Sequence, residues 1–242
     1  MPSVLAGLVH VPVVWAAAAL LVRSPGGLGE MGAYNAASQW RVLVAFVPSA
    51  LSSIALPMLS QLLAQGQSRR FVRALWMNIG VNAAAGMLVA IPISAGAYWI
   101  MAAYGPGFAE RWPALVALCF VAVLQATNGV VAQALISTGR MWWGFVLNAA
   151  WAVELLTAAW LLLPLGATGL ALAHLIAYVL HTAQVGAYVA LVLKTTVPPE
   201  APVSGGAASA GVTGDEAAAA GAAGATAMTD APGVMQKPLE VP

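Results

Sequence analysis

The chain has 242 residues, of which 61% are apolar and 7% are charged, and its mean hydropathy is +0.86. Soluble domains carry about 25% charged residues, so this composition excludes an ordinary soluble protein and indicates an integral membrane protein. The formal net charge is +1, and Lys and Arg form no basic patch that would bind a nucleic acid. The single cysteine, Cys119, cannot form an intrachain disulfide and supplies no metal cluster.

Six apolar stretches between residues 1 and 193 are long enough for membrane-spanning helices, which need about 20 apolar residues each. We predict an all-α, polytopic membrane protein whose six transmembrane helices form one lobe. The turn LGATG between the last two stretches is so short that these helices must be antiparallel neighbours. In chain order, the predicted spans are Val4–Val22, Gly32–Leu63, Leu75–Met101, Trp112–Ile136, Met141–Leu163 and Leu170–Leu193.

Residues 194–242 differ in character from the six spans. They are rich in Ala, Gly, Pro and Thr and show no periodicity of large apolar side chains. Such a segment cannot bury enough apolar surface to offset the chain entropy lost on folding. We predict a disordered, cytoplasmic tail without a functional site.

The distribution of Lys and Arg between the connections predicts the orientation in the membrane, because the richer side usually faces the cytoplasm. The richer side carries Arg69, Arg70, Arg73, Arg140 and Lys194, and the other side carries Arg23, Arg41 and Arg111. Both termini are therefore expected in the cytoplasm, with the chain in a bacterial cytoplasmic (inner) membrane.

The stretch Gly32–Leu63 carries a polar face although it is apolar overall. At about 100° per residue, one narrow face collects Asn35, Ser38, Gln39, Ser49, Ser53 and Ser60. Pro48 and Pro57 favour kinks in the same stretch, because proline lacks a backbone donor. The face is either a packing seam of small residues or the wall of a substrate cavity. In the second case the candidate cavity residues are Asn35, Gln39 and Arg41.

Amide side chains on the fourth span form a second candidate surface. Gln125 and Asn128 share a face, and Gln133 lies at its edge. Uncharged amides suit sugar hydroxyls, because an amide both donates and accepts hydrogen bonds. The alternative is that these residues only form hydrogen bonds between helices.

Three ionisable side chains inside spans are candidates for ion coupling. Glu154 is the only carboxylate within a span, where a charge costs about 2.5–3.5 kcal/mol, so it is either a coupling or substrate-contacting group or a structural group with a hydrogen-bond partner. His174 and His181 share a helix face with Tyr178, and they either relay protons or are satisfied by neighbouring helices. No carboxylate or cysteine has the spacing that a metal site would need.

Motifs of several enzyme classes are absent from the sequence. There is no Gly-rich phosphate loop with Lys, no Gly-x-Ser-x-Gly elbow and no zinc signature. The sparse, scattered ionisable residues also argue against a membrane enzyme that acts on lipid-linked sugars. We expect no catalytic residue and no cofactor.

Two segments resemble a known transporter family. The first is GEMGAYNAASQWRVLVAFVPSALSSIALPMLSQL, and the second is YGPGFAERWPALVALCFVAVLQATNGVVAQALISTGRMWWGFVLNAAW. Both are similar to spans of Wzx-type polysaccharide and O-antigen flippases of the multidrug/oligosaccharidyl-lipid/polysaccharide (MOP) exporter superfamily. The resemblance covers roughly residues 2–193 and leaves out the tail.

The resemblance implies a MATE-like, all-helical transporter of two six-span lobes around a central cavity. The family moves undecaprenyl-diphosphate-linked glycans, such as lipopolysaccharide precursors, between leaflets by alternating access, without an ATPase of its own and with suspected ion or proton coupling. This chain holds one lobe, so a fragment, a split protein or self-association is expected, with a second six-span lobe completing the cavity. Cationic residues for a diphosphate are few, and Arg41 is the best candidate.

The predicted function is therefore the flipping of a lipid-linked oligosaccharide, a polysaccharide precursor, across the membrane. Two alternatives stay open. One is a cation-coupled exporter of drugs or other small molecules with the same fold. The other is a non-transporting membrane scaffold or a truncated lobe.

Overall fold

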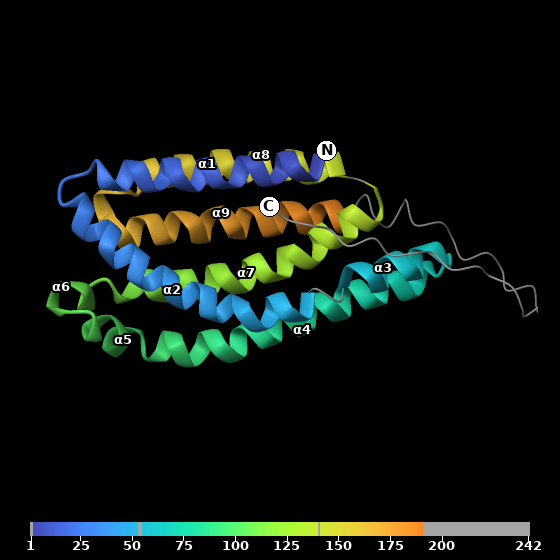
Figure 1. Ribbon diagram of the computed structural model, residues 1–242, viewed down its shortest axis with the longest axis horizontal. Coiled ribbons are helices and arrows are strands. Elements are labelled where there is room, and N and C mark those ends of the chain that lie inside the picture. The colour runs from blue at the N-terminus through green and yellow to red at the C-terminus, as the bar shows by residue number, and fades with distance from the viewer. Residues whose placement is uncertain (1, 53–54, 140, 191–242) are drawn as a thin grey trace, which may run out of the picture. The chain divides into compact units, whose positions relative to one another are not determined.

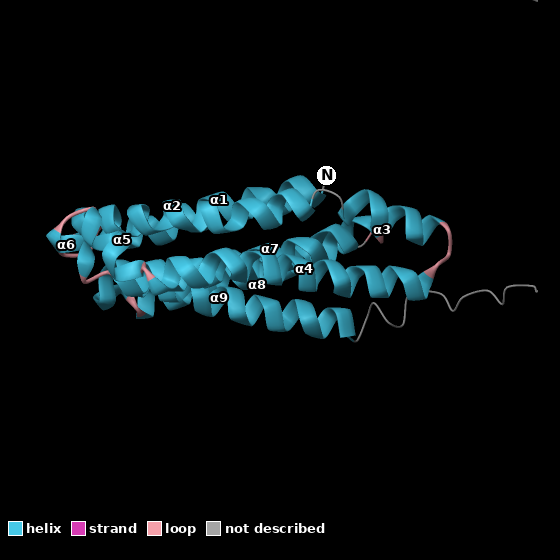
Figure 2. Cartoon of the chain, turned by 90° about the horizontal axis from the view of Figure 1, so that it is seen from below, coloured by secondary structure: helices cyan, strands magenta, loops and turns pink. Residues whose placement is uncertain are grey.

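A computed structural model describes residues 2–52, 55–139 and 141–190, and the predicted tail lies outside them. Within these ranges the chain is helical apart from short connections, and no strand occurs (Figure 2). In chain order the elements are α1 (Pro2–Val22), α2 (Gly27–Ser52), α3 (Ala55–Ala64), α4 (Ser68–Ala95), α5 (Ala97–Ala103), α6 (Pro106–Ala109), α7 (Trp112–Ser137), α8 (Met141–Leu161), the 3-10 helix η1 (Leu163–Leu165) and α9 (Gly166–Tyr188).

Five helical stretches of the described residues are long and apolar enough to cross a membrane, which confirms the prediction of an all-α, polytopic membrane protein. The first predicted span, Val4–Val22, is helical throughout as part of α1. The five long stretches are Gly27–Ala64, Ser68–Ala95, Trp112–Ile136, Met141–Leu161 and Leu163–Tyr188.

The third predicted span differs from the structure at both ends. The helix α4 begins at Ser68, so the segment with Arg69, Arg70 and Arg73 is helical rather than a loop. At the other end, α4 stops at Ala95, and Gly96 has the non-helical angles φ −90° and ψ 3° before α5 begins. The prediction of one continuous helix over Leu75–Met101 was therefore wrong.

The sixth span begins four residues earlier than the sequence predicts. The segment LGATG is not a turn throughout, because α9 begins at Gly166 and the preceding η1 makes the turn. The first turn of α9 donates a hydrogen bond to a side chain on another helix, which is described below. The local sequence around Gly166 does not indicate this contact. The predicted packing of α8 against α9 is confirmed.

The helix α7 is the central element of the bundle, packed against α2, α4 and α9, and α8 packs against α1 and α9 (Figure 1). The apolar segment of α7 is 61% buried inside the bundle, whereas the apolar segments of the other four long spans are 21–44% buried. Gly86 lets α4 approach closely, since a Cβ there would lie 3.1 Å from Val123 Cγ2 on α7 and 3.5 Å from Pro48 Cγ on α2. The core is thus built around α7.

The connections gather at two ends of the bundle. The α1–α2 connection, α5 and α6 lie at one end, and the α3–α4 connection lies at the other (Figure 1). Arg23 and Arg111 belong to the first group, as the sequence predicts, whereas Arg140 and Lys194 lie outside the described residues. Arg41 differs, because it lies about 16 Å along α2 from Glu30, at 1.5 Å per residue. It therefore belongs to the interior of a span and not to a connection.

Candidate functional site

A cavity of about 560 Å³ lies between α1, α2 and α9. This volume is within the range of about 300–1,000 Å³ that is usual for small-molecule sites. Asn35, Ser38 and Arg41 come from α2, His174 from α9 and Trp15 from α1. The walls therefore combine a cation, an amide, a hydroxyl, an imidazole and an indole.

Helical spacing brings these side chains together. Asn35, Ser38 and Arg41 follow one another at intervals of three residues, so they share one face of α2. On α1, Ala18 and Ala19 line the same cavity, and their methyl groups leave the space between the helices open. The cavity is thus a consequence of a polar face on one helix opposite small residues on another.

Arg41 supplies the positive charge of the cavity. Its side chain is half-buried, and in the described ranges the salt bridges found involve Arg111 and none involves Arg41. A cation within a membrane span is costly unless water or a counter-ion accompanies it. The cavity is therefore suited to an anionic group that pairs with Arg41.

His174 contributes a hydrogen-bond acceptor. The residue is 1% exposed, and its Nδ1 lies 2.9 Å from the carbonyl oxygen of Leu170. Because a carbonyl only accepts, Nδ1 carries the proton, and Nε2 of the neutral ring is an acceptor. That buried Nε2 has no partner in the described structure. An unmet buried polar atom costs about 1–3 kcal/mol, so a donor group that reached Nε2 would relieve this cost.

The structure brings three of the predicted site residues together and separates the others. Asn35, Arg41 and His174 line the cavity, whereas Gln39 is not among its lining residues. Gln39 is exposed, and Ser49 and Ser60 farther along the same polar face are exposed too. At Gln39, Ser49 and Ser60 this face is therefore not packed within the described bundle, and it is available there to water or to another protein.

The amides of α7 lie apart from Arg41. Asn128 is 9% exposed, and its Nδ2 donates a 2.9 Å hydrogen bond to Thr182 Oγ1 on α9. Asn128 and Thr182 line a smaller cavity of about 260 Å³, between α4, α7 and α9. Gln125 and Gln133 are half-buried and are not among the residues that line either cavity. Asn128 thus joins two helices.

Glu154 has the partner that the sequence leads us to expect. Gln184 Nε2 on α9 donates a hydrogen bond to Glu154 Oε1 on α8, while Glu154 Oε2 is buried with no partner among the described residues. His181 lies in a different setting from His174, since its ring meets Tyr178 edge-on with centroids 6.4 Å apart. A coupling role for Glu154, His174 and His181 stays a prediction.

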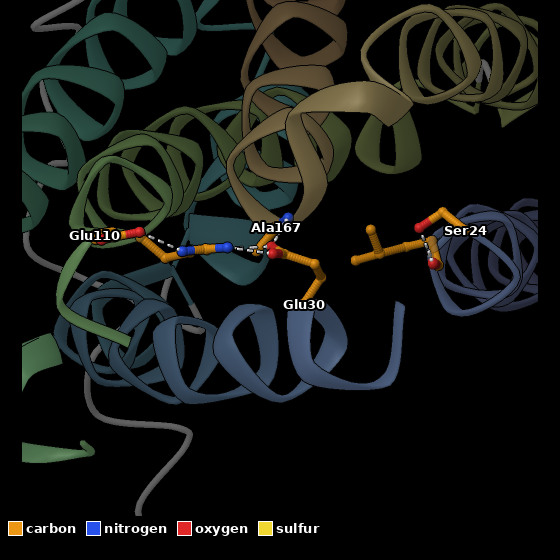
Figure 3. Close-up of polar contacts among 6 residues, drawn as sticks. Ser24, Glu30, Glu110 and Ala167 are labelled. Carbon is orange, nitrogen blue, oxygen red and sulfur yellow. Dashed lines mark hydrogen bonds and ion pairs between the residues drawn. The ribbon is translucent and has the colours of Figure 1, made fainter. Parts of the chain in front are cut away.

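An ion pair joins three segments at the end of the bundle that carries α5 and α6 (Figure 3). Arg111 Nη2 lies 2.5 Å from Glu30 Oε1, and Glu30 Oε2 accepts a 2.8 Å hydrogen bond from the Ala167 backbone N–H. The hydrogen bond with Glu30 raises the pKa of the Arg111 guanidinium above its ordinary value. A Cβ at Gly166 would collide with the Glu30 carboxylate, so glycine is required there.

Glu30 was not among the predicted site residues, although the sequence contains a signal for its pairing with Arg111. Glu30 follows the first predicted span and Arg111 precedes the fourth, so the predicted topology places both on one side of the membrane. In a chain with only 7% charged residues, two opposite charges on one side are candidates for pairing. A second cavity, of about 890 Å³, lies beside this ion pair.

No cluster of three or more His, Cys, Asp or Glu side chains that could hold a metal ion occurs in the described part of the chain. The residues of the cavity between α1, α2 and α9 instead offer hydrogen bonds and one positive charge. Such a set can bind and orient a polar ligand.

The long apolar helices define an all-α, multi-pass membrane protein. The chain is 30% identical over 172 residues, or 69% of its length, to the EPS I polysaccharide export inner membrane protein EpsE of Ralstonia nicotianae. It is 31% identical over 188 residues, or 74% of its length, to the protein of the same name from Ralstonia solanacearum. The alignments cover 38% and 41% of these relatives, so the chain spans about two fifths of their length. No family model and no solved structure matches the chain significantly.

Proposed function

We propose that this chain is a six-helix lobe of an inner-membrane transporter that flips a lipid-linked oligosaccharide, of the Wzx and MOP type, for polysaccharide export. The similarity to two polysaccharide export inner membrane proteins supports the process and the membrane. Alternating access of two lobes would expose the cavity first to one leaflet and then to the other. This activity is transport and needs no catalytic residue.

The observation that carries the proposal is the position of Arg41 in the cavity between α1, α2 and α9. A lipid-linked glycan has a diphosphate between its lipid and its sugars, and guanidinium groups bind phosphates strongly. Asn35 on the same wall both donates and accepts. The cavity therefore offers one group for the phosphates and others for the sugar.

The test replaces Arg41 in the bacterium whose gene encodes this chain. We expect Arg41→Gln to reduce surface polysaccharide at least tenfold and to raise the amount of lipid-linked precursor in the membrane. Arg41→Lys keeps the charge but loses the bidentate geometry, so intermediate export is expected. Immunoblots of membrane fractions establish that each variant is present at the level of the original protein.

Arg73→Gln is the matched control, because Arg73 is an exposed cation on α4 outside the cavity. This variant should export normally. Full export with Arg41→Gln at normal protein level would contradict the proposed role of the cavity. Full export after deletion of the gene would contradict the transport function itself.

The uncovered polar face of α2 supports a second six-helix lobe as partner. Asn35, Gln39 and Ser49 are exposed there, and the relatives are more than twice as long as the matched region. Polar side chains facing hydrocarbon are unfavourable, whereas a facing lobe would enclose them around water and substrate. A second copy of this chain is the alternative partner.

Cross-linking tests this arrangement. A cysteine in place of Gln39 should form a cross-linked species in native membranes. The original chain, whose Cys119 is buried, is the background control. Mass spectrometry of that species distinguishes a second copy from another six-helix chain. A monodisperse monomer without cross-links would contradict both possible partners, a second copy of this chain and another six-helix chain.

The proposed orientation places the α3–α4 connection and both termini in the cytoplasm. Pro25 and Gln65 are exposed in connections at the two ends of the bundle. A membrane-impermeant maleimide applied to intact spheroplasts should label Pro25→Cys and should label Gln65→Cys only after permeabilisation. The reverse pattern would establish the opposite orientation.

A further inference from the structure

We propose that His174 and Trp15 form a subsite for a sugar ring in the cavity between α1, α2 and α9. The inference rests on the proposed function, because it names the part of the lipid-linked glycan that this cavity would recognise. The first sugar, attached directly to the diphosphate, is the ligand group in question. Arg41, on the same cavity wall as Asn35, would hold the phosphate.

His174 selects for a hydrogen-bond donor in the ligand. Its Nδ1 is committed to the Leu170 carbonyl oxygen at 2.9 Å, its Nε2 is buried and unpartnered, and the residue is one of those that line the cavity. Phosphate oxygens without a proton cannot donate to an acceptor nitrogen, whereas sugar hydroxyls and N-acetyl amides can. The imidazole therefore distinguishes the sugar from the diphosphate, which Arg41 attracts.

Tyr34 helps to hold the imidazole in place. Its ring lies 5.8 Å from the His174 ring between centroids, tilted by 38°, and Tyr34 is 6% exposed. With Nδ1 fixed by the backbone of its own helix and one ring face covered, His174 has a defined orientation. An acceptor with a fixed direction can discriminate between positions of a hydroxyl on a sugar ring, because hydrogen bonds depend on angle.

Trp15 offers the apolar surface that a sugar ring requires. The residue lines the cavity and is 74% exposed, so its indole is not used for packing within the described bundle. Pyranose rings present C–H groups on one face, which carry partial positive charge and stack on the electron-rich face of an aromatic ring. Ala18, one turn farther along α1, lines the same cavity and leaves room beside the indole.

The two residues approach the cavity from different helices. Trp15 belongs to α1 and His174 to α9, while Arg41 belongs to α2. A ligand that stacks on the indole and donates to Nε2 would therefore be held between α1 and α9, with its anionic end toward α2. This combination of a cation, an aromatic surface and a hydrogen-bond acceptor fits a glycosyl phosphate better than a purely anionic or a purely apolar ligand.

The test compares lipids that differ only in their sugar. The full chain, purified with any partner that accompanies it and placed in nanodiscs, is titrated with undecaprenyl diphosphate and with the same lipid carrying glucose, galactose, N-acetylglucosamine or N-acetylgalactosamine. Native mass spectrometry measures the apparent Kd of each. We expect at least one sugar-bearing lipid to bind about tenfold more tightly than the bare lipid, which corresponds to about 1.4 kcal/mol.

Variants assign that difference to the two residues. Trp15→Leu and His174→Leu should each remove the tenfold preference, so that each variant binds the sugar-bearing lipid and the bare lipid with equal affinity. Arg41→Gln should weaken the bare and the sugar-bearing lipids alike. Trp99→Leu is the control, because Trp99 is 71% exposed and is not among the residues that line this cavity, so the preference should persist.

The possible failures are distinguishable. Equal affinity of the original protein for all five lipids would overturn the sugar subsite while leaving lipid-diphosphate transport intact. No binding of any of the five lipids would overturn the proposed function as well. If His174→Leu does not fold, Trp15→Leu decides the question, since Trp15 is exposed. A preference retained in Trp15→Leu would place recognition of the sugar elsewhere.

Discussion

Glu30 and Arg111 are 81 residues apart in the chain, yet the Arg111 guanidinium donates to both oxygens of the Glu30 carboxylate. The same carboxylate accepts a hydrogen bond from the first turn of α9 through the Ala167 N–H. Anionic groups are favoured at a helix N-terminus, where backbone N–H groups are unpaired. This contact therefore holds the starts of α2, α7 and α9 together.

Removal of this carboxylate should destabilise the bundle. We expect Glu30→Ala to lower the free energy of unfolding by about 1–3 kcal/mol, because Arg111 and the Ala167 N–H both lose a charged acceptor. Thermal unfolding in a mild detergent measures the effect. Glu110→Ala is the matched control, since Glu110 also pairs with Arg111 but is 81% exposed, and exposed pairs contribute only about 0–1 kcal/mol. Equal losses for both variants would contradict a structural role for the part-buried contact between Glu30 and Arg111.

Gly166 should not tolerate a side chain. Its φ of +58° is unfavourable for other residues, and a Cβ would collide with the Glu30 carboxylate. Gly166→Ala should therefore lower the midpoint of thermal unfolding more than Gly26→Ala, because Gly26 has a φ of +71° but open space around it. In a double variant with Glu30→Ala, the additional cost of Gly166→Ala should shrink toward that of Gly26→Ala. An unchanged additional cost would show that the collision does not matter.

Asn82 should stabilise the contact between α2 and α4. It is fully buried, and its Oδ1 accepts a 2.9 Å hydrogen bond from Ser52 Oγ. Interhelical hydrogen bonds in membranes contribute about 0.6 kcal/mol on average and up to about 1.7 kcal/mol. Asn82→Ala should therefore be less stable than Asn78→Ala, because the bond from Asn78 Nδ2 stays within α4. The reverse order in thermal unfolding would refute this interpretation.

Asn128 should act as a helix-packing residue rather than as a substrate contact. Its hydrogen bond to Thr182 joins α7 to α9, so Asn128→Ala should lower stability by about 1 kcal/mol. Polysaccharide export should remain normal when the protein level is matched. Gln125→Ala, a half-buried amide on the same helix, controls for the loss of an amide alone. Loss of export by a fully stable Asn128→Ala protein would instead assign Asn128 to the substrate.

Much of the fold could be predicted from local sequence because a membrane imposes a simple rule. Every backbone polar group in hydrocarbon must be paired within its own segment, so long apolar stretches become helices at nearly the positions that hydropathy indicates. The fourth span shows this well, since Trp112–Ile136 was expected and α7 covers Trp112–Ser137. The start of α9 at Gly166 was missed, because its partner Glu30 is distant in sequence.

The sequence by itself determined that the chain is an all-α membrane protein, that α8 and α9 are neighbours, and that Asn35 and Ser38 lie on one polar helix face. Those features depend on composition, on connection length and on helical periodicity, which are local properties. Only the tertiary structure decided that His174 joins Arg41 in one cavity while Asn128 bonds to Thr182 elsewhere. The physical reason is that periodicity defines the face of each helix, whereas packing against other helices decides which faces meet.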